Sequence, residues 1–169
     1  MKSKTFTPMP NRVLGIDPGF DRLGLAILHG SGQKQELLHS ECVTTSAKEA
    51  HETRLLKLGT RVREVIRKWQ PESIAIEKLF FNQNTTSALK VAEARGTILF
   101  LAAEAGLSVY EYSPQDVKIA VTGYGKADKK SVWVMVSKLV QIKTKAKKLD
   151  DELDAIAVGI THLASRKLI

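Results

Sequence analysis

Four carboxylates occupy positions in the sequence at which acidic side chains can bind metal ions and serve in catalysis. Asp17 ends one apolar strand-like run, just before a Pro-Gly turn, and Glu77 ends another. Asp151 and Asp154 are three residues apart at the start of the last predicted helix, and therefore share one face of it. Carboxylate oxygens are hard ligands that suit Mg²⁺ or Mn²⁺. Two such ions can activate a water and stabilise the leaving oxygen in phosphodiester hydrolysis.

These acids also have simpler structural interpretations. Asp17 could cap the Pro-Gly turn, and the acidic helix start, DDELD, could interact favourably with the helix macrodipole. The dipole accounts well for Asp150 and Glu152. Asp154, however, lies beyond the first turn and opens an apolar run that should be buried. Because an unpaired buried charge is costly, a bound divalent cation is the simplest explanation of Asp154.

The elements that must position these acids form one predicted α/β sheet in the order β-β-β-α-β-α-β-α-α-α. The sequence predicts strands over residues 12–17, 22–28, 35–43, 73–77 and 108–112. It predicts helices over residues 47–69, 85–105, 114–121, 129–142 and 150–167. Short turns favour an antiparallel meander of the first three strands, and a helical crossover should place the fourth strand parallel to the first. Asp17 and Glu77 would then meet at one edge of the sheet, where ligands commonly bind.

Length and composition fit a single folded domain. The chain has 169 residues, of which 43% are hydrophobic and 26% charged, as in ordinary globular proteins. Residues 1–11 lack the apolar segment of a secretion signal and are predicted to be a disordered tail, which leaves 12–169 as the domain. No apolar run approaches a membrane span, and the single cysteine, Cys42, excludes a disulfide within the chain. We therefore expect a cytoplasmic protein with no membrane partner.

The net charge of +8 is concentrated in one segment. Residues 113–148 hold nine lysines against two aspartates. A one-sided basic region indicates a polyanionic partner, most often nucleic acid. A solvated surface that keeps the protein soluble is the alternative. An acidic site within a basic protein fits a nuclease, in which lysines hold phosphates while carboxylates hold metal ions.

Four blocks of the sequence occur in an order and at a spacing that match one known family. They are GIDPGFDRLGLAIL, AIEKLFFNQNTTSALKVAEARG, QDVK followed by GYGKADKK, and DDELDAIAVGITH. Together they resemble RuvC, the family of bacterial Holliday-junction resolvases, from about Arg12 to Ala164. The resemblance implies a ribonuclease H-like fold, an α/β sheet of three antiparallel strands and then two parallel ones, flanked by helices.

The same resemblance implies an activity and its requirements. Members of the family are homodimers that make paired symmetric nicks across four-way junction DNA, in homologous recombination and DNA repair. The resemblance implies dependence on Mg²⁺, with two ions in each active site and Mn²⁺ able to substitute. It leaves open the dimer strength, the preferred cleavage sequence and whether a RuvA–RuvB branch-migration complex delivers the junction.

The resemblance also assigns roles position by position. The family's four catalytic and metal-binding acids fall on Asp17, Glu77, Asp151 and Asp154. Its aromatic residue that inserts at the junction centre falls on Phe80, with Phe81 beside it; the alternative for both is a hydrophobic staple to the following helix. Its basic DNA contacts fall on Lys118 and Lys129, and Lys130 is a further candidate.

One departure from the family and three other functions stay open on the sequence. The family often has a proline shortly before the acidic helix, where this chain has Lys-Lys-Leu, so Asp150 could take the place of Asp151. An RNA-processing nuclease of the YqgF group shares a similar first strand and turn. A junction-binding protein could have lost cleavage, although all four acids are present. A sugar-kinase-type ATPase also begins with a strand, an Asp and a Gly, but the basic segment and Glu77 argue against it.

Overall fold

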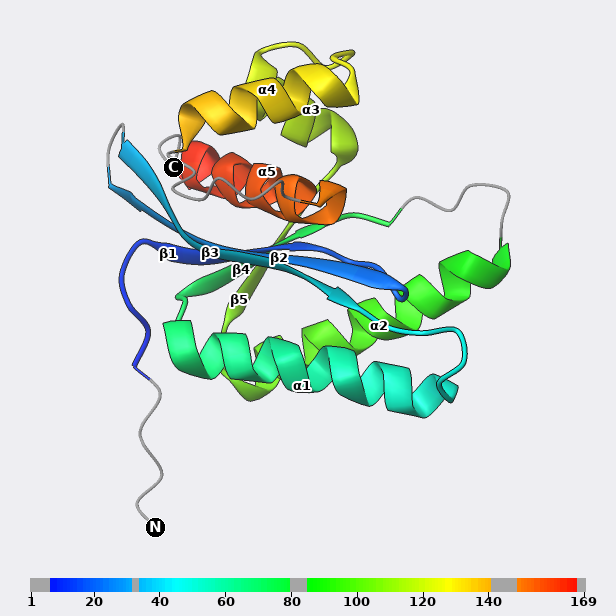
Figure 1. Cartoon of the computed structure of the whole chain (residues 1–169). Helices are drawn as coiled ribbons and strands as arrows, with labels where there is room; N and C mark the ends of the chain where they lie inside the picture. The colour runs from blue at the N-terminus through cyan, green and yellow to red at the C-terminus, as the bar shows by residue number, and fades with distance from the viewer. Residues whose placement is uncertain (1–6, 32–33, 80–84, 141–148, 167–169) are drawn as a thin grey trace.

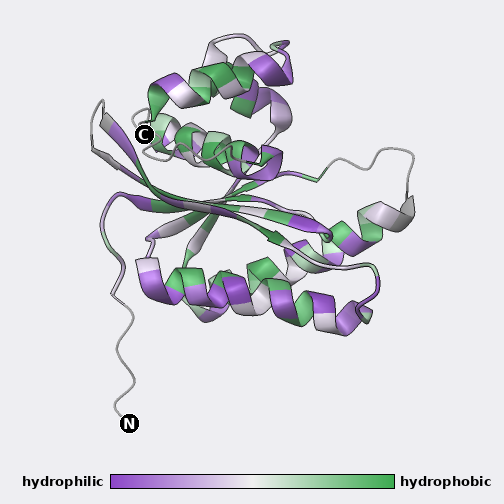
Figure 2. Cartoon of the chain, in the orientation of Figure 1, coloured by the Kyte–Doolittle hydropathy of each residue, from purple (hydrophilic) through white to green (hydrophobic). Residues whose placement is uncertain are grey.

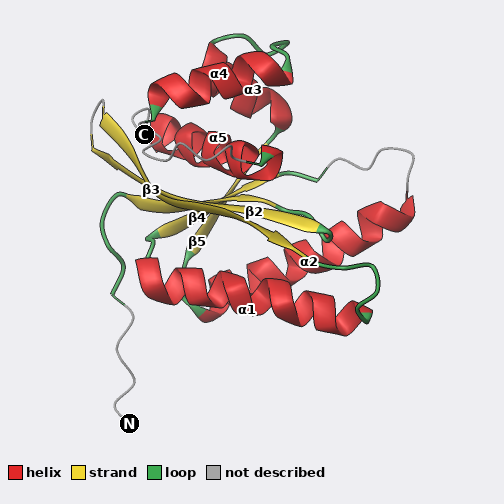
Figure 3. Ribbon diagram, viewed as in Figure 1, coloured by secondary structure: helices red, strands yellow, loops and turns green. Residues whose placement is uncertain are grey.

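One mixed β-sheet separates two layers of helices, as Figure 1 shows. The structure is a computed structural model that describes residues 7–31, 34–79, 85–140 and 149–166. The sheet consists of β1 (Arg12–Asp17), β2 (Arg22–Ser31), β3 (Lys34–Thr44), β4 (Ser73–Glu77) and β5 (Ser108–Tyr112). One helical layer is formed by α1 (His51–Trp69) and α2 (Thr85–Glu104), and the other by α3 (Pro114–Thr122), α4 (Lys129–Leu139) and α5 (Asp150–Ser165), as the ribbon in Figure 3 also shows.

The strands lie in the order β3-β2-β1-β4-β5. β1 pairs with β2, and β2 with β3, in antiparallel register, whereas the pairs β1–β4 and β4–β5 are parallel. The predicted sheet of three antiparallel strands followed by two parallel ones is therefore confirmed. Parallel pairing follows from the crossover through α1, which returns the chain in the direction of β1.

Two predicted helix boundaries were wrong. α1 begins later than the predicted residue 47, because a local turn forms first, in which the Ser46 amide donates a hydrogen bond to the Glu49 carboxylate at 2.7 Å. α4 ends before Val140, whose backbone is extended, rather than at residue 142. Neither change affects the strand ends that carry Asp17 and Glu77, which lie where the sequence predicts them.

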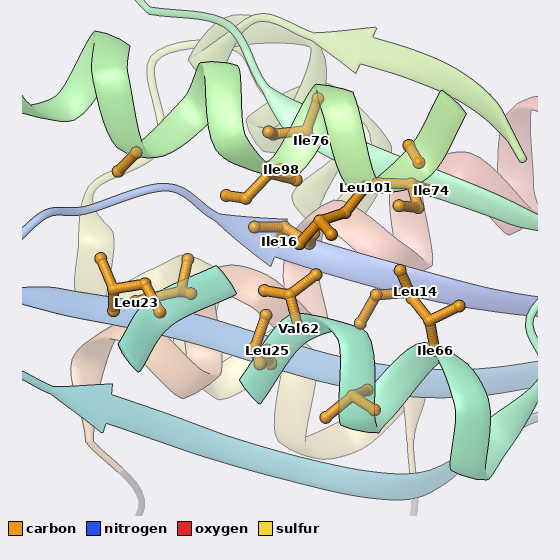
Figure 4. Packing of buried hydrophobic residues seen from close by; sticks show 14 of the residues in the cluster. Leu14, Ile16, Leu23, Leu25, Val62, Ile66, Ile74, Ile76, Ile98 and Leu101 are labelled. Atoms are coloured by element: carbon orange, nitrogen blue, oxygen red, sulfur yellow. The ribbon is translucent and has the colours of Figure 1, made fainter. Parts of the chain in front are cut away.

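The two faces of the sheet carry side chains of different size, because successive residues of a strand point to opposite faces. Large aliphatic side chains pack against α1 and α2, as Figure 4 shows for Leu14, Ile16, Leu23, Leu25, Ile74 and Ile76. The face toward α5 carries the smaller residues Gly15, Gly24, Ala26 and Ala75, together with the larger pair Val13 and Leu28. Small residues on this face allow α5 to lie close to the sheet.

Hydrophobic and hydrophilic residues alternate along the helices, as Figure 2 shows, and the buried hydrophobic residues of the helices pack against the sheet. Several large hydrophobic side chains of the helices are exposed, among them Leu56, Leu89 and Phe100. Among the helices of the described ranges, none combines the length and the hydropathy needed to cross a membrane.

The predicted N-terminal tail is described only from residue 7 onward. Within it, the Met9 amide donates a hydrogen bond to the Gln70 carbonyl at 2.8 Å. The Asn11 carbonyl accepts another from the Gly30 amide at 3.0 Å. These two bonds fix the chain just before β1 against the loop after α1 and against β2.

Candidate active site

Strand parity places two of the predicted acids on the α5 face of the sheet. In β1, Gly15 faces α5, and Asp17 lies two residues later on the same face. In β4, Ala75 packs in the core on the α5 side, and Glu77 follows at the same spacing. Because β1 and β4 are parallel neighbours, both acids lie at the same edge of the sheet.

α5 carries the other two acids over this edge. The backbone carbonyl of Asp151 lies against Gly24 of β2, and that of Ala155 lies against Gly15 of β1, so that a Cβ at either glycine would overlap backbone atoms of α5. The N-terminal half of α5 therefore crosses β1 and β2 in direct backbone contact. The side chains of Asp151 and Asp154 keep 21% and 28% of their exposure, and both are thus partly buried at the sheet edge.

The other three acids lie close enough to Asp17 to raise its pKa. Burial first, and neighbouring carboxylates second, raise the pKa of Asp17 from 3.8 to about 7. The contributing carboxylates, in decreasing order, are Glu77, Asp154 and Asp151. Burial and then Asp154 also raise the pKa of Glu77, while Lys129 lowers the pKa of both strand acids. The fold thus gathers the four predicted acids into one electrostatically coupled group.

Asp151 is held by two side chains of the neighbouring strands. It forms an ion pair with Arg22 of β2 and accepts a hydrogen bond from the Cys42 thiol of β3, with 3.8 Å between Sγ and Oδ2. Asp150 is exposed, and its charge is not among those that raise the pKa of Asp17. The helix register therefore brings Asp151, rather than Asp150, to the group of acids.

Asp154 is held by two residues of α4. Lys129 Nζ lies 2.9 Å from Oδ2 of Asp154, and the indole N–H of Trp133 donates a hydrogen bond to Oδ1 at 3.1 Å. By contrast, no hydrogen bond from a described residue reaches the carboxylate of Asp17 or of Glu77. The acids on the helix thus have positive or N–H partners, whereas the acids on the strands share only the nearby charge of Lys129.

This donor set fits a divalent cation. Four carboxylates with no histidine or thiolate among them are the oxygen ligands that Mg²⁺ and Mn²⁺ prefer. The partly buried acids Asp17 and Glu77 carry charge that the described residues compensate only in part, and a cation would complete that compensation. Within the described ranges, no three side chains are yet arranged as a metal-binding cluster, and Arg22, Lys129 and Trp133 engage the acids of α5 instead.

The predicted DNA-binding residues are only partly brought together. Lys129, at the start of α4, reaches the acids directly. Lys118 of α3 and Lys130 of α4 lie close enough to Asp128 to lower its pKa, after the larger effect of its hydrogen bonds with Ser131. Phe80 and Phe81 lie outside the described residues.

Two residues of this site were not singled out from the sequence, Arg22 and Trp133. Arg22 begins β2, and the antiparallel register sets the start of β2 beside the end of β1 that carries Asp17. That placement could have been found from the predicted meander. Trp133 lies four residues after Lys129 and therefore on the same face of α4. Its contact with Asp154 depends on how α4 packs on α5, which no local pattern encodes.

The sheet order and the acids at the ends of β1 and β4 and on α5 define the ribonuclease H-like class. Within that class, the chain belongs to the RuvC family, since the family model described as "Crossover junction endodeoxyribonuclease RuvC" matches residues 13–162. The resemblance seen in the sequence is therefore confirmed.

Individual relatives agree with this family membership. The chain is 43% identical over 153 residues to the crossover junction endodeoxyribonuclease RuvC of Alkaliphilus metalliredigens. The matched segment covers 90% of this chain and 93% of the relative. It is similar to Thermus thermophilus RuvC, solved in complex with Holliday junction substrate, with a TM-score of 0.88 and 39% identity over 93% of this chain and 95% of that one. The yeast mitochondrial Holliday junction resolvase shares the fold, with a TM-score of 0.70 at 13% identity over 95% of this chain and 81% of that one.

Proposed function

We propose that this chain is a structure-selective DNA endonuclease that resolves four-way junctions by paired symmetric nicks. The observation that carries the proposal is the gathering of Asp17, Glu77, Asp151 and Asp154 at one sheet edge in a member of the RuvC family. The relative with a Holliday junction in its structure supports junction DNA as the substrate. A bacterial-type nuclease of this kind would act on chromosomal DNA in the cytoplasm.

The four acids would hold two Mg²⁺ ions, with Mn²⁺ able to substitute. When bound, such ions activate a water and stabilise the leaving oxygen of a phosphodiester. Because the pKa of Asp17 is raised to about 7, the free site retains a proton on this carboxyl near neutral pH. Cation binding must displace that proton, so it should strengthen as the pH rises through about 7.

The DNA contacts would be divided between charge and stacking. Lys118, Lys129 and Lys130 would bind backbone phosphates and supply most of the affinity. Phe80, with Phe81 beside it, would stack on an unpaired base at the junction centre, and this assignment stays a prediction from the sequence.

A homodimer would supply the two active sites that paired nicks require. On α2, Leu89 and Phe100 are 64% and 63% exposed, and their spacing of about three turns puts both on one face. An exposed apolar pair on one helix face favours association with a second copy. A RuvA–RuvB branch-migration complex is a further proposed partner, which would deliver the junction.

The experiment that tests this function is cleavage of a synthetic mobile four-way junction with Mg²⁺, mapped on all four strands. We expect symmetric nicks on two opposing strands, and their loss in Asp154→Asn. Junction binding without nicks, in Mg²⁺ and in Mn²⁺, would instead favour a non-enzymatic junction-binding protein. Absence of junction binding, with cleavage of structured RNA, would favour an RNA-processing nuclease.

Lys129→Met is expected to move the pH dependence of cation binding to higher pH. The Lys129 ammonium lowers the pKa of Asp17 and of Glu77, so its removal raises both values and lets protons compete up to a higher pH. The measurement is the midpoint pH of Mn²⁺ binding by calorimetry, rather than the affinity at one pH. Lys126→Met, on the exposed loop before α4, is the matched control and should keep the wild-type midpoint. Equal midpoints in both variants would contradict the role given to Lys129.

A further inference from the structure

Two donors from successive turns of α4 hold the carboxylate of Asp154. The Trp133 indole N–H bonds Oδ1 at 3.1 Å, and Lys129 Nζ lies 2.9 Å from Oδ2. The Lys129 ammonium also lies 4.9 Å from the centre of the Trp133 ring, within the range of a cation–π contact. The two oxygens of one carboxylate are thus assigned to two different partners.

These partners respond differently to a divalent cation. Lys129 carries a positive charge, so it competes with a cation for Asp154 and is repelled by it. The Trp133 indole is neutral and only donates, so it can keep its bond to Oδ1 whether or not a cation is present. A neutral donor on a ligating carboxylate fixes its orientation and leaves the other oxygen available.

We infer that Trp133 is a positioning residue, whose indole N–H orients Asp154 for divalent-cation binding while Oδ2 is the oxygen exchanged between Lys129 and the cation. The inference rests on the proposed function, because it requires Asp154 to be a cation ligand. It adds a positioning residue on α4 to a set of proposed cation ligands that come from β1, β4 and α5.

The chain offers a matched control for this inference in its second tryptophan. The indole N–H of Trp69 is buried and has no hydrogen-bond partner among the described residues, whereas that of Trp133 bonds Asp154. Tryptophan to phenylalanine removes the N–H at both positions and keeps an aromatic ring. Only at Trp133 should the loss reach the acidic site.

The test is Mn²⁺ binding to the full chain by calorimetry. We expect Trp133→Phe to weaken binding about tenfold, as for other outer partners of metal ligands, and Trp69→Phe to bind as the wild type does. Equal affinity of Trp133→Phe and wild type would overturn the inference and leave the proposed function standing. Absence of saturable Mg²⁺ or Mn²⁺ binding in the wild type would instead overturn the proposed metal site itself.

A spectroscopic measurement keeps the inference testable if Trp133→Phe does not fold. In Trp69→Phe the only remaining indole is that of Trp133. We expect its emission to change saturably with Mg²⁺, with the midpoint found by calorimetry, and to stay constant when Asp154→Asn is added. An emission that does not respond to Mg²⁺ while calorimetry reports binding would overturn the inference.

Discussion

Asp17→Asn is expected to abolish junction cleavage and to leave junction binding close to that of the wild type. Burial is the largest cause of the raised pKa of Asp17, and all three other acids raise it further. Loss of its charge should remove cation binding from the centre of the group. We expect cleavage to fall about a thousandfold or more, which corresponds to about 4 kcal/mol of lost transition-state stabilisation. Binding should persist, because phosphate contacts of the lysines supply most of the affinity.

The matched control for this cleavage experiment is Asp150→Asn. It removes one carboxylate from the same acidic region, but from an exposed position outside the group that acts on Asp17. Cleavage by Asp150→Asn should stay close to the wild-type rate on the same junction. Loss of junction binding together with cleavage in Asp17→Asn would contradict the division of labour between acids and lysines.

Asp17→Asn is also expected to raise the free energy of unfolding above neutral pH in the absence of divalent cations. The pKa of Asp17 is raised from 3.8 to about 7, so between these values the folded protein holds a proton that the unfolded chain has lost. The free energy of unfolding therefore falls as the pH rises through this window, by an amount on the order of 4 kcal/mol. Asn carries no ionisable group, and the variant should lack this decline.

Urea unfolding at a series of pH values, with a chelator present, measures this effect. The wild type should lose stability from about pH 4 to pH 7, and Asp17→Asn should follow a flatter curve. Added Mg²⁺ should restore stability to the wild type more than to the variant, because a ligand that binds only the folded state stabilises it. Parallel curves for the two proteins would contradict the raised pKa.

Gly15→Ala is expected to destabilise the protein by about 3 kcal/mol or more. A Cβ at Gly15 would overlap the Ala155 carbonyl oxygen and lie 2.9 Å from the Gly159 amide nitrogen. Both neighbours are backbone atoms of α5, so relief requires the helix to move away from the sheet. Total stabilities of single domains are about 5–15 kcal/mol, so this loss is a large fraction. Because α5 carries Asp151 and Asp154, cleavage should fall as well, even under conditions where the variant is folded.

Two other glycines provide controls for this prediction, with urea unfolding as the measurement. A Cβ at Gly96 in α2 would meet nothing within 4 Å, so Gly96→Ala should stabilise the helix by about 0.5–1 kcal/mol. A Cβ at Gly159 would meet the Leu28 side chain, which can move, so Gly159→Ala should cost less than Gly15→Ala. Equal effects of Gly15→Ala and Gly159→Ala would show that α5 is free to shift on the sheet.

Local sequence patterns predicted the limits of a strand correctly where its apolar run was short and had clear ends. β1, β4 and β5 have the predicted limits, because each is a brief run that ends at a turn or a helix cap. Alternation along β1 and β4 already implies that Asp17 and Glu77 share a face. The start of α1 was wrong because the residues after 46 suit a helix equally well, and a side-chain bond to the Ser46 amide chose the turn.

The sequence by itself thus determined the family, the sheet and the four acids, because these depend on residue type and short spacing. Only the tertiary structure decided that Asp151 rather than Asp150 joins the group, and that Arg22, Lys129 and Trp133 hold the acids of α5. These contacts depend on the distance between α5 and the sheet and on the register of α5 along it. Gly15 of β1 and Gly24 of β2 set both, because they lie against the backbone of α5. Such a register is the result of many packed residues distant in sequence, and no single stretch of the chain encodes it.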